Sequence, residues 1–307
     1  MTPESKENKG IFKSKIRIEV FRHDQRDKTI KVPDEKSRLT KGGSIHAKEI
    51  GKTKNPNPRV GLAYGSPRER SQETALRALM ANEDWVTEDM TMEEILKGIE
   101  ERGGRGKKII ASEKLNYKGD VHPEYAKLYD YHFFKACDAI PFLYNESDDL
   151  VRKLGDNEDF CYTRQAANVA DFVKKYLGVL PHWEKLTEEK PEKYKEIDEM
   201  QRFLGTHGSV TECFLLKIIE KTEGKDEAKR FIDSLSNKNG IDFSDGISID
   251  LGYEGEEVKV KISFHDKTWD VDEAMIDNII EDKTRLDEET EVKRKELEEG
   301  LKNNKKV

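Results

Sequence analysis

The chain has 307 residues, and its 63 acidic side chains outnumber 55 Lys and Arg, which gives a net charge of -8. This balance argues against a protein that binds the nucleic-acid backbone. No apolar run approaches the about 20 residues that a membrane-spanning helix needs, and no secretory signal is visible. The three cysteines form no CxxC pair, which fits a reducing compartment. We therefore expect a cytoplasmic protein without nucleic-acid or membrane partners.

Short apolar blocks predict four strands followed by a hairpin. In the first block, Ile16, Ile18 and Val20 alternate with polar residues and share one face of a strand. The later blocks are RVGLAYGSP (59–67), KKIIASEKL (107–115), RFLGTHG (202–208) and the alternating segment 246–264, which turns at a glycine.

Amphipathic helices are predicted between these strands. One follows Ser66-Pro67, with Pro67 in its first turn, and another starts at a capping box of Thr91 and Glu94. A third starts near Arg164 and is expected to end at Gly178, and a fourth directly follows the fourth strand. Strands that alternate with helices predict an α/β fold, a three-layer α/β/α sandwich with a mainly parallel central sheet and a C-terminal hairpin.

Composition divides the chain into three parts. Residues 1–14 are polar and are expected to be a flexible segment, 15–280 form the domain, and 281–307 form a charged tail or exposed helix. Residues 115–160 are rich in aromatic side chains and are predicted to form a cap inserted between the third and fourth strands. Residues 181–200 read as a proline-broken surface connection.

Arginine and histidine side chains stand at or just after the ends of three of the predicted strands. Arg22 and His23 end the first strand, Arg70 follows the second, and His207 follows the fourth. Open α/β sheets bind ligands at the carboxyl ends of their strands. The positions of these residues therefore predict a basic pocket in an acidic protein.

These segments carry a family resemblance. FRHDQR (21–26), RLTKGGSIHAKEIG (38–51), SPRERSQETA (66–75) and THGS (206–209) occur in the order seen in the histidine phosphatase superfamily, which has the phosphoglycerate-mutase-like fold. The chain resembles this superfamily over most of residues 15–275. Four motifs that agree in order and in context are far more specific than any one of them.

The resemblance implies a role for each residue of the pocket. His23 is the expected nucleophile, attacking phosphorus through one ring nitrogen while the other holds its proton toward a backbone carbonyl. Arg22, Arg26 and Arg70 would bind phosphate oxygens through forked donors, and His207 would be a further phosphate ligand. The arginines would also keep the imidazole of His23 neutral. Neither a metal nor a cofactor is expected.

Two positions depart from the family pattern. Asp24 stands where the family often has Gly, and a carboxylate there would weaken anion binding unless it points away or pairs with Arg26. The acid that protonates the leaving group is also missing from its usual places, which hold Tyr117 and Gly208 here. Asp120 is the predicted acid. Glu113 and Glu124 are the alternatives. His46 is expected to have a structural role, either by packing against its neighbours or by forming a surface hydrogen bond.

The function predicted from the sequence is hydrolysis of a small phosphorylated substrate through a phosphohistidine on His23. Two alternatives remain open at this stage, a phosphoglycerate-type phosphomutase and a catalytically silent protein that binds a phosphorylated ligand. The sequence identifies neither the substrate nor the oligomeric state.

Overall fold

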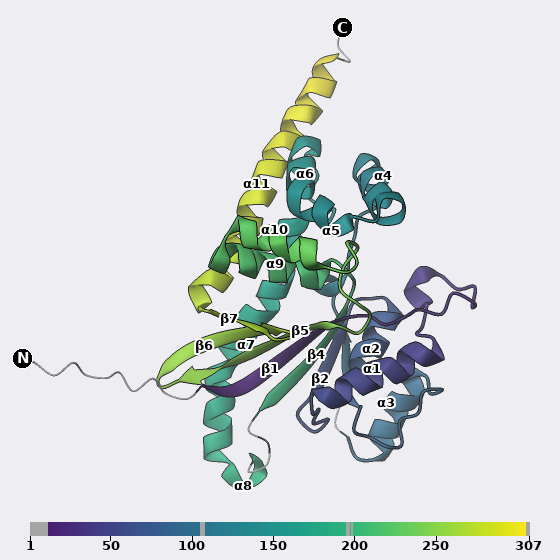
Figure 1. Ribbon diagram of the computed structural model, residues 1–307, viewed down its shortest axis with the longest axis vertical. Coiled ribbons are helices and arrows are strands. Elements are labelled where there is room, and N and C mark those ends of the chain that lie inside the picture. The colour runs from purple at the N-terminus through teal and green to yellow at the C-terminus, as the bar shows by residue number, and fades with distance from the viewer. Residues whose placement is uncertain (1–11, 105–107, 195–196, 198, 305–307) are drawn as a thin grey trace, which may run out of the picture.

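The computed structural model describes residues 12–104, 108–194, 197 and 199–304, and Figure 1 shows their arrangement. Most of the predicted flexible segment 1–14 lies outside the described residues. One sheet contains seven strands in the order β3-β2-β4-β1-β5-β6-β7. The strands are β1 (Lys13–Arg22), β2 (Leu62–Gly65), β3 (Ile109–Ala111), β4 (Met200–Thr206), β5 (Gly246–Glu254), β6 (Glu257–Phe264) and β7 (Lys267–Val271).

The parallel and antiparallel halves of the sheet match the prediction. β1, β2, β3 and β4 pair in parallel, whereas β5, β6 and β7 extend the sheet by antiparallel pairing. The predicted hairpin is β5 and β6, which turn at Gly255 with a φ of 65°. The strand β7 was not predicted separately and adds a third antiparallel strand beside β6.

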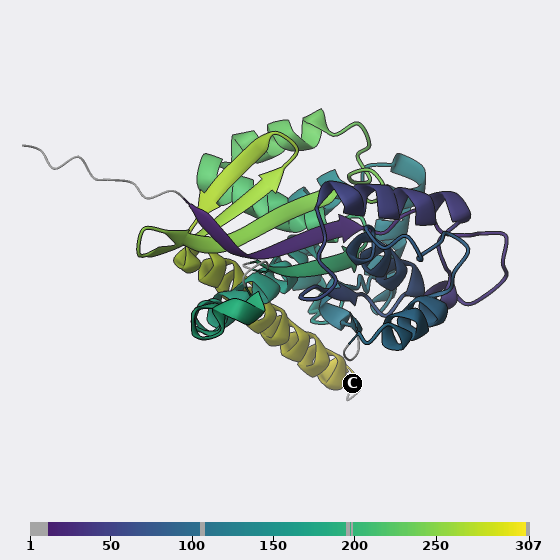
Figure 2. The same ribbon diagram turned by 90° about the horizontal axis from the view of Figure 1, so that it is seen from below.

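Helices cover both faces of the sheet, as the α/β prediction requires. One group consists of α1 (Lys41–Thr53), α2 (Glu69–Leu79) and α3 (Met92–Glu101). The other consists of α7 (Tyr162–Glu189), α9 (Val210–Glu223), α10 (Lys225–Ser234) and α11 (Glu273–Asn304). Figure 2 shows the long helices α7 and α11, which pack against each other.

Short helices make up most of the segment between β3 and α7. They are η2 (Glu113–Leu115), α4 (Pro123–Tyr131), η3 (His132–Ala136), α5 (Ala139–Phe142), η4 (Leu143–Ser147) and α6 (Asp148–Leu154). Two further short helices lie elsewhere, η1 (Asp34–Lys36) and α8 (Pro191–Tyr194).

The side chains of the central strands divide between two apolar cores, one on each face of the sheet. Ile16, Ile18 and Val20 of β1 are fully buried in the larger core with α7 and α9. Phe21, which points to the other face because strand side chains alternate, packs with Phe203 of β4 in the smaller core with α2 and α3.

Two helix boundaries differ from the sequence prediction. The helix α7 does not end at Gly178 but continues through Pro181 to Glu189, so the first part of the predicted surface connection is helical. Proline removes one backbone hydrogen bond there, but Leu180 and Trp183 are buried and extend the apolar face of the helix beyond it. At the other boundary, α2 begins at Glu69, so Pro67 precedes the helix instead of lying in its first turn.

One local prediction is confirmed. The predicted capping box is present at the start of α3, where Thr91 Oγ1 accepts from the Glu94 amide at 3.1 Å and the Glu94 carboxylate accepts from the Thr91 amide at 2.6 Å. The acid- and base-rich residues after 281 continue the helix α11. Within the part of the chain that the structure describes, no helix has the length and apolarity needed to cross a bilayer.

The register of the parallel strands sets the position of the site. Arg22 of β1 lies opposite Thr206 of β4, and Gly65 of β2 lies opposite Gly205. These strands therefore end at the same level, and the residues that follow them meet at one edge of the sheet. Gly205 also lets α2 approach closely, because a Cβ there would lie 1.8 Å from the backbone oxygen of Ser71.

Candidate active site

Two histidine rings meet where β1 and β4 end. The rings of His23 and His207 lie edge to face with 5.0 Å between their centroids. The amide of His23 donates to the carbonyl of Thr206 at 2.7 Å, which ties the two strand ends together. The structure thus brings together the two histidines that are 184 positions apart in the sequence.

Hydrogen bonds define the tautomer of His23. Its Nδ1 lies 2.7 Å from the backbone oxygen of Asp24, and because a carbonyl can only accept, Nδ1 carries the proton. The lone pair is therefore on Nε2, which accepts from Nε of Arg70 at 3.2 Å. Burial, followed by the charge of Arg70, lowers the pKa of His23 to about 3. A neutral imidazole whose Nε2 is unprotonated is the reactive form of a histidine nucleophile.

His207 lies deeper and has an unused ring nitrogen. Its Nε2 is 2.8 Å from Oγ of Ser66, and the residue is only 2% exposed. Among the described residues, Nδ1 of His207 and Nε of Arg22 are buried without a hydrogen-bond partner. Burial, and then the neighbouring His23, keep the pKa of His207 well below its usual value. Buried polar atoms are costly to leave unpaired, so these two nitrogens mark positions that a ligand can satisfy.

Arg70 is the most buried of the arginines predicted for the pocket. It is 3% exposed, and burial followed by the charge of Arg68 lowers its pKa to about 10. Its Nη1 and Nη2 donate to the backbone and carboxylate oxygens of Asp34 at 2.8 and 3.1 Å. Nη1 of Arg22 donates to the backbone oxygen of Ile241.

Asp34 gathers three guanidinium groups around one carboxylate. Arg26, Arg68 and Arg70 all form ion pairs with it. The sequence analysis singled out neither Asp34 nor Arg68. The motif SPRERSQETA did contain Arg68, whereas nothing in the polar segment around Asp34 distinguishes it from other surface acids. Three forked cations that converge on one carboxylate can also bind another oxyanion.

The carboxylate of Asp24 is hydrogen-bonded to groups other than His23 and His207. The residue is 3% exposed, and its oxygens accept from Nδ1 of His46 at 2.6 Å, from the Gln25 amide at 2.6 Å and from Oγ of Ser244. His46 therefore forms a hydrogen bond, as the sequence analysis expected. The acid next to His23 holds the turn after β1 in place and does not oppose an anion in the pocket.

The cavity around the histidines has a volume of about 750 Å³. Arg22, His23, Arg26, Arg70 and His207 all line it, as does Arg68. Of the three candidate acids, Asp120 lines the cavity as an exposed residue, whereas Glu113 and Glu124 are not among its lining residues. Asp130, which the sequence analysis did not consider, is a second exposed acid in the lining.

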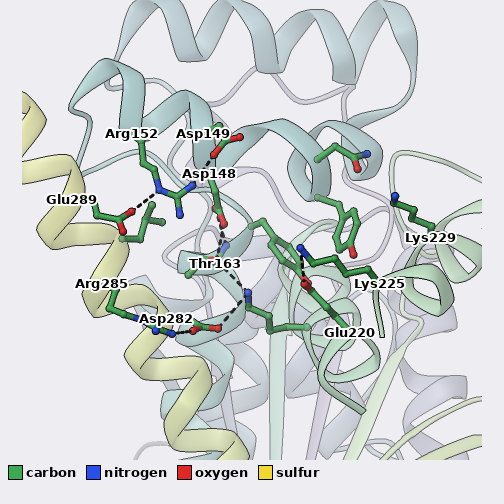
Figure 3. Close-up of a pocket in the computed structure, with 15 residues that line it drawn as sticks. Asp148, Asp149, Arg152, Thr163, Glu220, Lys225, Lys229, Asp282, Arg285 and Glu289 are labelled. Atoms are coloured by element: carbon green, nitrogen blue, oxygen red, sulfur yellow. Dashed lines mark hydrogen bonds and ion pairs between the residues drawn. The ribbon is translucent and has the colours of Figure 1, made fainter. Parts of the chain in front are cut away.

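A second cavity of about 520 Å³ lies between α6, α7, α9, α10 and α11 (Figure 3). Its acids and bases largely pair with one another. The pairs include Arg152 with Glu289 at 2.6 Å, Lys217 with Asp282 at 3.4 Å and the Tyr162 hydroxyl with Glu220 at 2.9 Å. This cavity contains no histidine, so the first cavity is the candidate active site. No group of three or more His, Cys, Asp or Glu side chains arranged to hold a metal ion occurs in the described residues.

Comparison with known proteins finds similarity in solved structures alone. No model of a protein family matches the sequence, and no curated protein matches it at a significant level. The chain is similar to "Mycobacterial hydrolase 2", with 14% identity, a TM-score of 0.40 and coverage of 86% of this chain and 95% of that one. It is also similar to a mycobacterial glucosyl-3-phosphoglycerate phosphatase, with 14% identity, a TM-score of 0.38 and coverage of 81% of this chain and 97% of that one. A third similar structure is YhfR of Bacillus stearothermophilus, with 14% identity, a TM-score of 0.37 and coverage of 79% of this chain and 94% of that one.

At such low identities and TM-scores the similarity carries no argument about the activity of this chain.

Proposed function

We propose that the protein is a phosphomonoesterase of the histidine phosphatase type, which hydrolyses a small phosphorylated substrate through a phosphohistidine on His23. The observation that carries this proposal is the state of the His23 ring. Its Nδ1 proton is held by the Asp24 carbonyl and its Nε2 lone pair faces the guanidinium of Arg70. A nucleophilic nitrogen thus lies beside a buried guanidinium that can donate to a phosphate oxygen.

In the first step, the Nε2 lone pair attacks phosphorus and the P–O bond to the leaving group breaks. The three remaining phosphoryl oxygens carry spread negative charge in the transition state, so catalysis depends on donors that are already in position. Arg22, Arg26 and Arg70 are proposed to supply these donors, together with the unpaired Nδ1 of His207. The leaving oxygen takes a proton from a carboxylic acid, which we assign to Asp120.

In the second step, water attacks phosphorus and the N–P bond breaks. The electron pair of that bond returns to Nε2 of His23, and the carboxylate of Asp120 accepts the proton that the water loses. Inorganic phosphate then leaves, and the original protonation state is restored. The steps use side chains of this chain alone, so we propose that the reaction does not depend on a metal ion.

A second candidate function is binding of a phosphorylated ligand without turnover. The exposed position of Asp120 favours it, because an acid at the rim of the cavity has to approach the leaving oxygen before it can protonate it. Both candidates use the same anion-binding side chains, so activity distinguishes them.

The test is release of nitrophenol from p-nitrophenyl phosphate in the presence of a chelator. The proposal predicts turnover by the wild type and loss of at least about 1,000-fold in His23→Ala. His182→Ala is the matched control, because this histidine is exposed on α7 and contacts a backbone oxygen of its own helix. A wild type that binds vanadate but turns over none of several monoesters would favour the silent binder.

A further inference from the structure

The cavity at the candidate site is larger than a phosphate group, and much of its wall is aromatic. Its volume of about 750 Å³ is within the range of pockets that enclose whole organic ligands. The aromatic residues that line it are Tyr117, Tyr129, Phe133, Phe134 and Phe243. The phosphate donors therefore account for one part of the cavity, and the aromatic residues surround the part where a leaving group would lie.

Two of these rings flank the histidines directly. The ring of Phe243 lies 6.3 Å from the ring of His23, and the ring of Tyr117 lies 4.9 Å from that of His207. Each ring also has an arginine over its face, at 4.6 Å for Arg22 on Phe243 and 4.4 Å for Arg68 on Tyr117. Aromatic surface thus begins immediately beside the groups proposed to bind the phosphate.

The other rings come from the short helices between β3 and α7. Tyr129 is 8% exposed and stacks on Phe133 at 5.8 Å, and Phe133 contacts Phe134 edge to face at 4.9 Å. Phe134 is 71% exposed, an unfavourable state for a phenyl ring in water. Both phenylalanines lie in the π-helical turn η3, which is followed by Cys137 with a left-handed φ of 56°. Such turns are frequent at functional sites.

Most polar residues of the lining outside the phosphate donors are exposed, whereas Asp27 and Thr40 are half-buried. Gln25, Lys28 and Asp130 line the cavity, but all three are exposed, so water already satisfies them. A sugar or a glycerol chain would present several hydroxyl groups to a wall that is mainly aromatic and offers few buried hydrogen-bond partners. A flat apolar ring would instead replace water at these surfaces and stack on them.

We infer that the substrate is a phosphomonoester whose leaving group carries a flat apolar ring close to the phosphate. This inference rests on the proposed function, since it assumes that the phosphoryl group lies at His23. The ring would lie between Phe243 and the aromatic residues of α4 and η3.

The test measures how much the ring contributes to binding, apart from the phosphate, by comparing benzylphosphonate with methylphosphonate. Neither compound can be hydrolysed. Calorimetry should show benzylphosphonate binding at least about tenfold more tightly, because a phenyl ring is removed from water. Phe134→Ala and Phe243→Leu should each reduce this preference, the latter by replacing an aromatic face with a smaller aliphatic one. Tyr131→Ala is the matched control, because Tyr131 is 52% exposed on the adjoining helix turn and is not among the lining residues.

Kinetics give an independent measure. Benzyl phosphate and glycerol phosphate both release an alkyl alcohol, so a difference in kcat/KM reports recognition more than leaving-group chemistry. We expect benzyl phosphate to be preferred by at least about tenfold. Equal affinity for the two phosphonates, or a preference for glycerol phosphate, would overturn the substrate class and leave the phosphate site intact. If neither phosphonate binds and no monoester is hydrolysed, the proposed function itself fails.

Discussion

The Nε nitrogen of Arg70 donates to Nε2 of His23 at 3.2 Å, so one guanidinium touches the atom proposed to attack phosphorus. This contact orients the imidazole and its lone pair. It also places a cation beside the position that the phosphoryl oxygens would occupy during transfer. Arg70 is therefore expected to act on both the ground state of the nucleophile and the charge of the transition state.

Arg70→Lys should lower kcat/KM by roughly 100-fold, because lysine keeps the charge but loses the planar fork that reaches His23 and a phosphate oxygen together. Arg26→Lys is the comparison. Because the Arg26 side chain is 40% exposed, this substitution should lower kcat/KM by less than about tenfold. Steady-state kinetics on p-nitrophenyl phosphate measure both variants, and thermal unfolding checks that each is folded. Equal losses in the two variants would contradict the special role of Arg70.

Asp34 competes with a bound phosphate for three arginines. Asp34→Asn should therefore strengthen the binding of vanadate by about fivefold to tenfold, because it frees donors of Arg26, Arg68 and Arg70 and removes one negative charge. Competitive inhibition by vanadate measures this affinity. Asp27→Asn serves as the control, because Asp27 also lines the cavity but its carboxylate accepts from Thr29 and not from an arginine of the pocket. Weaker binding in Asp34→Asn would show that Asp34 instead holds the arginines in place.

The leaving-group acid can be identified by varying the substrate. Asp120→Asn should lower kcat on an alkyl phosphate by roughly 100-fold but by less than about tenfold on p-nitrophenyl phosphate, because nitrophenolate leaves without protonation. Asp130→Asn provides the comparison, since it alters the other exposed acid of the cavity lining. The assignment to Asp120 is wrong if only Asp130→Asn discriminates between the substrates.

The sheet and the positions of the strand ends could be predicted from the sequence. Alternation at Ile16, Ile18 and Val20 identifies β1, and because parallel strands end at one edge, His23 and His207 were expected to meet there. The family resemblance added their roles. None of this required knowledge of the loops.

The end of α7 and the role of Asp34 were not predictable in the same way. Gly178 and Pro181 are local stop signals, but buried Leu180 and Trp183 outweigh them through tertiary contacts that the local sequence does not contain. Asp34 is one acid among 63 acidic residues, and only the folded loop brings it to the arginines. Contacts of this kind depend on the conformation of loops, and loop sequences lack the periodic spacing of apolar residues that identifies helices and strands.

The low pKa of His23 has a consequence for stability against acid. Between the ordinary pKa of histidine, about 6.5, and its folded value of about 3, the unfolded chain binds a proton at this residue that the folded protein does not. His23 therefore contributes a free energy of unfolding that falls as pH falls through this window, by up to about 1.4 kcal/mol per pH unit. Denaturant unfolding between pH 6.5 and 4 should show that the free energy of unfolding declines less steeply in His23→Gln than in the wild type. An unchanged slope would contradict the lowered pKa.

The central claim is that a covalent bond forms between phosphorus and Nε2 of His23. The most direct measurement is rapid acid-free quenching of wild-type protein during turnover of a labelled monoester, followed by mass spectrometry of its peptides. The account predicts one phosphoryl group, stable to base and labile to acid, on the peptide that contains His23 and none in His23→Ala. A phosphoryl group on another residue, or turnover by the His23→Ala variant at the wild-type rate, would contradict it.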